Sequence, residues 1–201
     1  MTWEIKVGNC LQKLQELEEK SIHCCVTSPP YWGLRDYKNN EQLGQEETPE
    51  KFVDNLVEVF EGVKRVLRDD GTLWLNLGDT NKNKSLVGVP WMVAFALKDA
   101  GWYLRSEIIW HKPNPMPESV KDRPTRAHEQ IFLFSKNKKY YYDAESIKTD
   151  STTTSSRKTP HKRTTQDWED GSGLQAHSGF DKEYTKANKR DVWSVPVKSY
   201  P

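Results

Sequence analysis

The pattern of hydrophobic and polar positions predicts strands and helices that alternate along the first two thirds of the chain. Apolar alternation or short apolar runs typical of strands occur at residues 3–7, 23–27, 72–79, 103–112 and 129–136. Apolar residues at helical spacing occur at residues 9–20, 49–71 and 87–102. This alternation predicts an α/β domain with a largely parallel sheet.

Local signals set the expected ends of these elements. Thr48 is the predicted N-cap of the longest helix, Pro49 its first residue, and Gly71 is expected to close it. The apolar run 23–27 has the compactness of a strand covered on both faces. It should end at Pro29 and Pro30, since neither residue can donate to a strand ladder.

Composition narrows the class of protein. The 201 residues are 35% hydrophobic and 29% charged with a net charge of +1, which fits a globular domain and argues against a strongly basic nucleic-acid binder. Residues 149–190 are rich in Ser, Thr, Gly and charge. They are expected to form either a disordered insertion or a segment that orders on DNA, and residues 191–201 recover apolar character.

The three cysteines make neither a disulfide framework nor a zinc motif, so no metal site is predicted. Adjacent Cys24 and Cys25 are expected to be buried thiols. The chain has no run of eighteen apolar residues and its N-terminus lacks the apolar segment of a signal peptide. These features predict a cytoplasmic protein that does not enter membranes.

The tetrapeptide Ser28-Pro29-Pro30-Tyr31 is the strongest candidate for chemistry. In open α/β sheets, ligands bind beyond the carboxyl ends of strands, where this segment is expected to lie. The prolines leave nearby carbonyl groups free to accept hydrogen bonds, and the tyrosine offers a face for stacking. The combination suits a nucleobase that carries an exocyclic amino group.

The segment TSPPY, Thr27 to Tyr31, resembles the catalytic motif of the DNA amino-methyltransferases, the family that methylates cytosine N4 or adenine N6. The similarity extends over about residues 3–143 and includes "VGNCLQKLQEL", "GTLWLNLGD" and "IIWHKPNPMPESVKDRPTRAHEQIFLFSK". It implies a Rossmann-like fold that uses S-adenosylmethionine. In the permuted arrangement of this family the catalytic part comes first, here residues 1–148.

The resemblance also implies roles for residues of the motif, with Ser28, Pro29, Pro30 and Tyr31 as the catalytic residues. The target base leaves double-stranded DNA, Ser28 and the Pro29 carbonyl hold its amino group, and Tyr31 stacks on the ring. The amino nitrogen is methylated directly, without a covalent enzyme intermediate. Serine before the prolines favours cytosine N4, and adenine N6 is the alternative.

Cofactor contacts are expected from Asn9, Thr27 and Ser28. The family usually has an aspartate where this chain has Asn9, and an amide oxygen can still accept from the cofactor's adenine. The alternative for Asn9 is a helix cap.

DNA contacts are expected from two places. Trp32 and Arg35 follow the motif and are predicted to form its lid. The proline-rich loop from Lys112 to His128 is predicted to contact phosphates, with the surface-loop alternative left open. Its basic residues are Lys112, Lys121, Arg123 and Arg126.

One expected feature is missing from the sequence. Nothing between residues 143 and 201 matches the glycine-rich cofactor loop that the family carries after its catalytic part. We therefore expect the N-terminal part of a longer or split enzyme, which a C-terminal chain would complete. The absent strands would belong between segment 3–7 and the strand ending at Thr27, leaving an unpaired edge and low stability. A cofactor-less module that binds DNA or a partner is the alternative function.

Overall fold

A computed structural model describes residues 2–39, 41–150 and 186–197. Its contacts divide the chain into two compact units, one of residues 1–142 and 190–201 and the other of residues 143–189. The predicted boundaries at residues 148 and 190 stay predictions.

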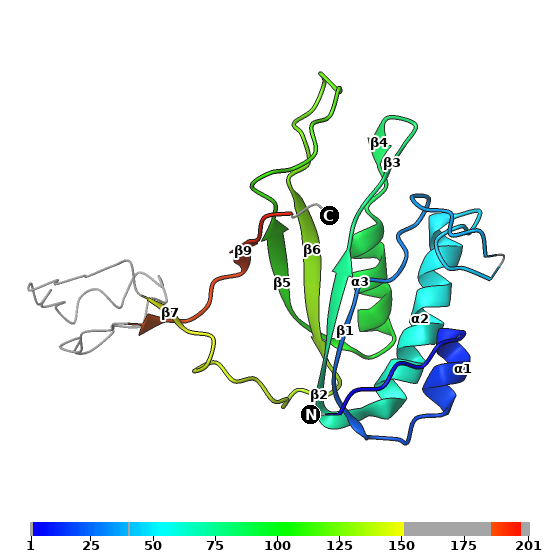
Figure 1. Cartoon of the computed structure of the whole chain (residues 1–201), viewed down its shortest axis with the longest axis vertical. Coiled ribbons are helices and arrows are strands. Elements are labelled where there is room, and N and C mark those ends of the chain that lie inside the picture. Colours follow the sequence, from blue (N-terminus) through cyan, green and yellow to red (C-terminus); the bar gives the residue numbers. More distant parts are fainter. Residues whose placement is uncertain (1, 40, 151–185, 198–201) are drawn as a thin grey trace, which may run out of the picture. The chain divides into compact units, whose positions relative to one another are not determined.

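The larger unit holds a five-stranded sheet in the order β1-β2-β6-β5-β9 (Figure 1). Its strands are β1 (Ile22–Thr27), β2 (Leu67–Leu77), β5 (Tyr103–His111), β6 (His128–Ser135) and β9 (Val192–Ser194). The helices are α1 (Cys10–Gln15), α2 (Pro49–Val66) and α3 (Val89–Asp99), and a small hairpin joins β3 (Asn81–Lys82) to β4 (Ser85–Leu86). The predicted α/β class is confirmed.

The sheet is mixed, so the prediction of a largely parallel sheet is wrong. β1 pairs with β2 and β5 with β9 in parallel, whereas β6 runs antiparallel to both β2 and β5. The reason is the connection from β5 to β6, which is a loop. Parallel neighbours need a crossover, usually helical, and this loop carries the chain straight back as an antiparallel neighbour.

Helix α2 begins as predicted and ends earlier than predicted. The Thr48 hydroxyl accepts a hydrogen bond from the Lys51 amide at the N-terminus. Leu67 is already extended, so the helix stops at Val66 and Gly71 lies inside β2. A Cβ at position 71 would lie 3.1 Å from the His23 carbonyl oxygen, so the glycine permits close approach of backbone from the neighbouring strand.

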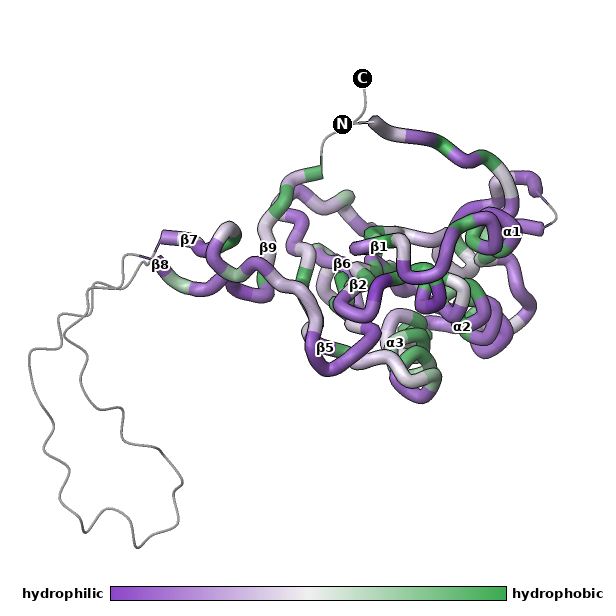
Figure 2. Tube along the Cα trace, turned by 90° about the horizontal axis from the view of Figure 1, so that it is seen from below, coloured by the Kyte–Doolittle hydropathy of each residue, from purple (hydrophilic) through white to green (hydrophobic). Residues whose placement is uncertain are grey.

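The helices lie on one side of the sheet, as Figures 1 and 2 show from two directions. The strand residues that face them are fully buried and include Leu73, Leu75, Leu77, Phe132 and Phe134. These side chains pack with apolar residues of α2 and α3 into the core.

The other face of β1 is open, so the prediction of a strand covered on both faces is wrong. The Val26 side chain is 77% exposed and Cys24 is exposed, because no described helix packs over them. Cys25 faces the core side and is half-buried; burial, together with the Cys24 thiol, raises its pKa to about 11. The expectation of two buried thiols therefore fails for Cys24.

Residues 3–7 do not form the predicted strand. They have no strand neighbour in the described part of the chain, and the side chains of Trp3, Ile5 and Val7 are exposed. Apolar alternation becomes a strand only where another strand satisfies its backbone groups. β1 is thereby left as an edge of the sheet.

The smaller unit contains a two-residue pairing of β7 (Thr149–Asp150) with β8 (Lys186–Ala187). Most of the segment 149–190, predicted to be a polar insertion, lies outside the described residues. No helix of the described ranges is long and apolar enough to cross a membrane.

Candidate functional site

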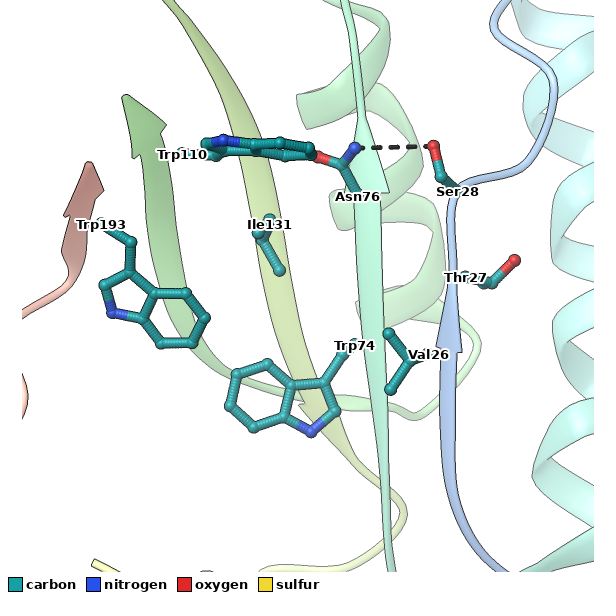
Figure 3. Close-up of a pocket in the computed structure, with 8 residues that line it drawn as sticks. All are labelled: Val26, Thr27, Ser28, Trp74, Asn76, Trp110, Ile131 and Trp193. Atoms are coloured by element: carbon teal, nitrogen blue, oxygen red, sulfur yellow. Dashed lines mark hydrogen bonds between the residues drawn. The ribbon is translucent and has the colours of Figure 1, made fainter. Parts of the chain in front are cut away.

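The tetrapeptide Ser28–Tyr31 lies directly after β1, as the sequence predicts. Thr27, the last residue of β1, is aligned with Leu75 of β2, which places Ser28 beside Asn76 on the neighbouring strand. Figure 3 shows the Ser28 hydroxyl pointing toward the Asn76 amide. The Ser28 side chain is exposed, whereas Pro29, Pro30 and Tyr31 are half-buried.

A hydrogen-bond network joins the motif to three strands. The Tyr31 hydroxyl lies 3.0 Å from Ser28 Oγ and donates to Glu129 Oε2 at 2.9 Å. Asn76 Nδ2 donates to the Tyr31 hydroxyl at 2.8 Å and to Glu129 Oε2 at 2.9 Å. Lys112 Nζ pairs with Glu129 Oε1. Asn76 of β2, Glu129 of β6 and Lys112, which follows β5, thus fix the position of the Tyr31 ring.

The electrostatics of the network follow from its partial burial. Burial raises the pKa of Tyr31, and the negative charge of Glu129 adds to the rise, so the phenol keeps its proton. Burial alone would raise the pKa of Glu129, but hydrogen bonds from Lys112, Asn76 and Tyr31 outweigh it and lower that pKa. Glu129 is therefore an ionised carboxylate that accepts a hydrogen bond from a protonated phenol.

Gly78, the residue after β2, has no side chain and so leaves room for the Tyr31 ring. A Cβ at position 78 would lie 2.5 Å from Tyr31 Cε2, too close for any side chain. One edge of the ring therefore rests against the backbone at the end of β2.

Two cavities adjoin the motif. The first, of about 320 Å³, is lined by Tyr31, Gly78, Glu129 and residues of the loop between β5 and β6. The second, of about 550 Å³, lies on the open sheet face and is drawn in Figure 3. Its lining is Val26, Thr27, Ser28, Trp74, Asn76, Trp110, Ile131 and Trp193. Ser28 and Tyr31 therefore stand between a polar cavity and an aromatic one.

The predicted DNA-contacting residues of the β5–β6 loop do not form one free basic surface. Lys112 and Arg126 line the polar cavity, but Lys112 is paired with Glu129 and Arg126 donates to the Asp79 carbonyl. Arg123 pairs with Glu118, and Lys121 is exposed. The acidic partners come from the same loop and from β6, so the local charge is more balanced than the basic residues alone suggest.

The remaining predicted residues separate into three cases. Trp32 is only 6% exposed and its indole donates to the Glu46 carbonyl, so a lid role for this side chain is wrong in this structure. The Trp32 ring packs in the hydrophobic core. Arg35 is exposed next to it. Asn9 caps α1 by accepting from the Leu11 amide, and no hydrogen bond among the described residues joins it to the motif.

Sequence reasoning missed Asn76, Gly78 and Glu129. Asn76 is the one amide in the apolar run "TLWLNL", and Glu129 opens the apolar run "EQIFLF". A polar residue at a half-buried strand position is a usable signal, because such groups need partners. Within the described residues, no group of His, Cys, Asp and Glu is placed to hold a metal ion.

Comparison with known proteins gives a consistent result. Residues 22–200 match the N6_N4_Mtase family, described as DNA methylase. The chain is 42% identical over 227 residues to the type II methyltransferase M.SmaI of Serratia marcescens, covering 98% of this chain and 68% of that protein. It is 48% identical over 170 residues to M.Cfr9I of Citrobacter freundii, covering 70% of this chain and 57% of the other.

Solved structures of DNA methyltransferases also resemble this chain. PvuII DNA methyltransferase, named as cytosine-N4-specific, superposes with a TM-score of 0.59 at 22% identity, over 69% of this chain and 50% of that one. A candidate DNA modification methylase of Thermus thermophilus, solved with S-adenosyl-L-methionine, gives 0.53 at 29% identity, over 70% and 58%. The chain thus spans between half and about two thirds of the length of these four proteins.

Proposed function

Since this chain belongs to the DNA methylase family, whose members use S-adenosylmethionine, we propose that it forms the target-base part of a DNA methyltransferase acting on an exocyclic amino group. The observation that carries the proposal is the Ser28–Tyr31 loop, held at the carboxyl end of β1 by the network around Glu129. This loop combines an exposed hydroxyl, a fixed aromatic ring and proline carbonyls at one point.

The polar cavity beside Tyr31 is the proposed site of the flipped base. A volume of about 320 Å³ accommodates one nucleobase, and the wall includes side chains able to hydrogen-bond its edge. In this arrangement the base stacks on Tyr31 while its amino group donates to Ser28 Oγ and to the Pro29 carbonyl. Accepting both amino protons keeps electron density on the nitrogen.

We propose cytosine N4 as the methylated atom. Support comes from serine at position 28, the feature of the motif that favours this base, and from a fold neighbour named as cytosine-N4-specific. Adenine N6 is the alternative within the same chemistry.

When bound, S-adenosylmethionine supplies an electrophilic methyl group. The residues that would face its reactive end are Thr27 and Ser28, because they terminate β1 where its outer edge has no neighbour in the described sheet. An exposed hydroxyl at a free strand edge fits one side of such a site. Asn9 is a further candidate, through the acceptor capacity that its capping hydrogen bond leaves unused.

We propose that a further polypeptide segment or a partner chain completes the site. The free edge of β1 can accept a strand, and the open face beside it presents Val26, Trp74 and Ile131. Without such a part, the chain would act only as a module that binds DNA or its partner. Arg35 and Lys121, both exposed, are proposed to contact DNA phosphates, with Arg123 and Arg126 supporting the loop.

The test is methyl transfer from labelled S-adenosylmethionine to unmethylated DNA, followed by mass spectrometry of the nucleosides. The chain is assayed alone and with a second polypeptide that carries the part of M.SmaI outside the matched region. N4-methylcytosine is the expected product, and N6-methyladenine would select the alternative. No product in either arm would refute the enzymatic function.

The residue test uses Ser28→Ala and Tyr31→Ala, with Ser85→Ala in the hairpin as the matched control. We expect both motif variants to lose at least about 100-fold in kcat while DNA affinity stays within a few-fold. Loss of DNA binding in these variants, when the wild-type chain shows no methyl transfer, would instead favour the binding module.

A further inference from the structure

A continuous chain of hydrogen bonds leads from the exposed hydroxyl of the motif to a mostly buried carboxylate. Ser28 Oγ lies 3.0 Å from the Tyr31 hydroxyl, and that hydroxyl lies 2.9 Å from Glu129 Oε2. Because Tyr31 donates to Glu129, its oxygen can accept from Ser28 in addition to the hydrogen bond that it accepts from Asn76. The hydroxyl donors of Ser28 and Tyr31 then both point from the motif surface toward Glu129.

The proposed reaction creates a need for such a chain. An amino nitrogen that gains a methyl group must lose one proton, since an N–H bond is replaced by an N–C bond. This step rests on the proposed function. The proton is first held by the groups to which the amino group donates, and Ser28 Oγ is the one that can pass a proton on.

We propose that Glu129 is the final acceptor of this proton, which reaches it through Ser28 and Tyr31. The N–H bond breaks as the proton moves to Ser28 Oγ, the serine proton moves to the Tyr31 oxygen, and the tyrosine proton moves to Glu129 Oε2. Serine and tyrosine end unchanged, and the carboxylate becomes a neutral carboxylic acid. One proton has moved, and no other reactant is required.

The surroundings of Glu129 suit this role. Lys112 binds Oε1, so Oε2 is the oxygen left for Tyr31 and Asn76. The lowered pKa of this carboxylate is no obstacle, because a methylated aromatic amino group that still carries its extra proton is a stronger acid than a glutamic acid side chain. The Glu129 side chain is 18% exposed and lines the polar cavity, which gives the proton a way to water after the product leaves.

Asp79, another carboxylate of the same cavity wall, does not compete for the role. Its side-chain oxygens accept from the backbone amides of Thr80, Gly88 and Val89 at the start of α3. It thereby caps α3, and no hydrogen bond within the described ranges connects it to Ser28 or Tyr31.

The experiment compares Glu129→Gln, Glu129→Asp and Tyr31→Phe in the assembly that shows wild-type methyl transfer. Glu107→Gln, a carboxylate of β5 outside the network, is the control. We expect kcat to fall by about 100-fold in Glu129→Gln, with KM for DNA changed less than about threefold. Glu129→Asp keeps a carboxylate and should retain more activity than Glu129→Gln. The double variant Tyr31→Phe/Glu129→Gln should be no slower than the slower single variant.

A second readout does not depend on turnover. In the isolated chain, the ¹³C resonance of the Glu129 carboxyl should titrate below the ordinary glutamate range, and Tyr31→Phe should raise that pKa by removing a donor. An unchanged Glu129 pKa in Tyr31→Phe would contradict the hydrogen bond from Tyr31 to Glu129, and with it the proposed relay.

The outcomes separate the relay from simpler roles. A wild-type enzyme that methylates DNA together with an equally fast Glu129→Gln would overturn the relay and leave the proposed function intact. A rise in KM alone would reduce Glu129 to a positioning residue for Tyr31. Absence of methylated nucleosides with the wild-type protein would refute the proposed function itself.

Discussion

The two faces of the sheet differ in almost every respect, although they are built from alternate residues of the same strands. On β2, Leu73 and Leu75 are fully buried under the helices, while Trp74 between them lines an open cavity. On β6, Phe132 is fully buried and its neighbour Ile131 lines the same cavity. The covered face is a finished core, and the open face is a large apolar surface of the kind that proteins use for association.

The difference places a packed core on one side of the motif and an open sheet face on the other. α2 and α3 supply one complete layer, which buries the large aliphatic and aromatic residues. The TSPPY motif stands at the boundary, since Tyr31 packs against the core and Ser28 lines the open side. Function is therefore predicted to depend on what covers the second face.

The largest expected effect on stability comes from a substitution on the sheet face that the helices cover. Phe132→Ala should lower the free energy of unfolding by about 3–5 kcal/mol, because it leaves a cavity in a packed core. Ile131→Ala, one residue earlier, should cost clearly less, since its side chain is only half-buried. Urea denaturation of both variants measures the difference. Equal losses would mean that the two faces are equally packed.

A smaller effect tests the open face. Val26→Lys should leave the unfolding free energy within about 0.5 kcal/mol, because the side chain is 77% exposed. It should weaken binding of the completing polypeptide by about tenfold or more, since a valine on the docking surface becomes a charge. Leu86→Lys, an exposed apolar residue of the hairpin, is the control and should not affect binding. Titration calorimetry gives both affinities.

The smallest effect concerns the boundary between the faces and depends on pH. The folded-state pKa of Glu129 is lowered, so its carboxylate stabilises the fold above the pKa of an unfolded glutamate, and this stabilisation is lost as the pH falls through the folded-state value. The wild-type chain should therefore lose more stability than Glu129→Gln between pH 7 and pH 4. Denaturation midpoints of the two proteins at both pH values measure it. An identical pH dependence in the two proteins would show that Glu129 is not the source of the stability loss at low pH.

Several elements were predictable because the rules that form them are local. The N-cap at Thr48, the end of β1 before Pro29 and the position of the TSPPY motif all depend on residues a few positions apart. The family and the α/β class follow from the same short patterns and are confirmed. The helix cap predicted as the alternative for Asn9 is also confirmed, and its cofactor contact stays a prediction.

The wrong predictions share a different cause. Segment 3–7 and the second face of β1 needed partners that the described chain does not provide, and Trp32 proved to be a core residue rather than a surface one. The phosphate contacts of the basic loop stay a prediction, but the acidic partners of Lys112 and Arg123 were not predicted. For segment 3–7, for β1 and for Lys112 the decisive neighbour lies outside the local sequence window, whereas Arg123 finds its partner within its own loop.

The sequence by itself determined the family, the position of the TSPPY motif and where the principal helices and strands lie, because short motifs, backbone preferences and hydrophobic periodicity act over short distances. Only the tertiary structure decided that β6 lies between β2 and β5, that one sheet face stays open, and that Glu129 meets Tyr31 across 98 positions of the chain. Such pairings depend on how distant strands align, and packing in three dimensions fixes that alignment.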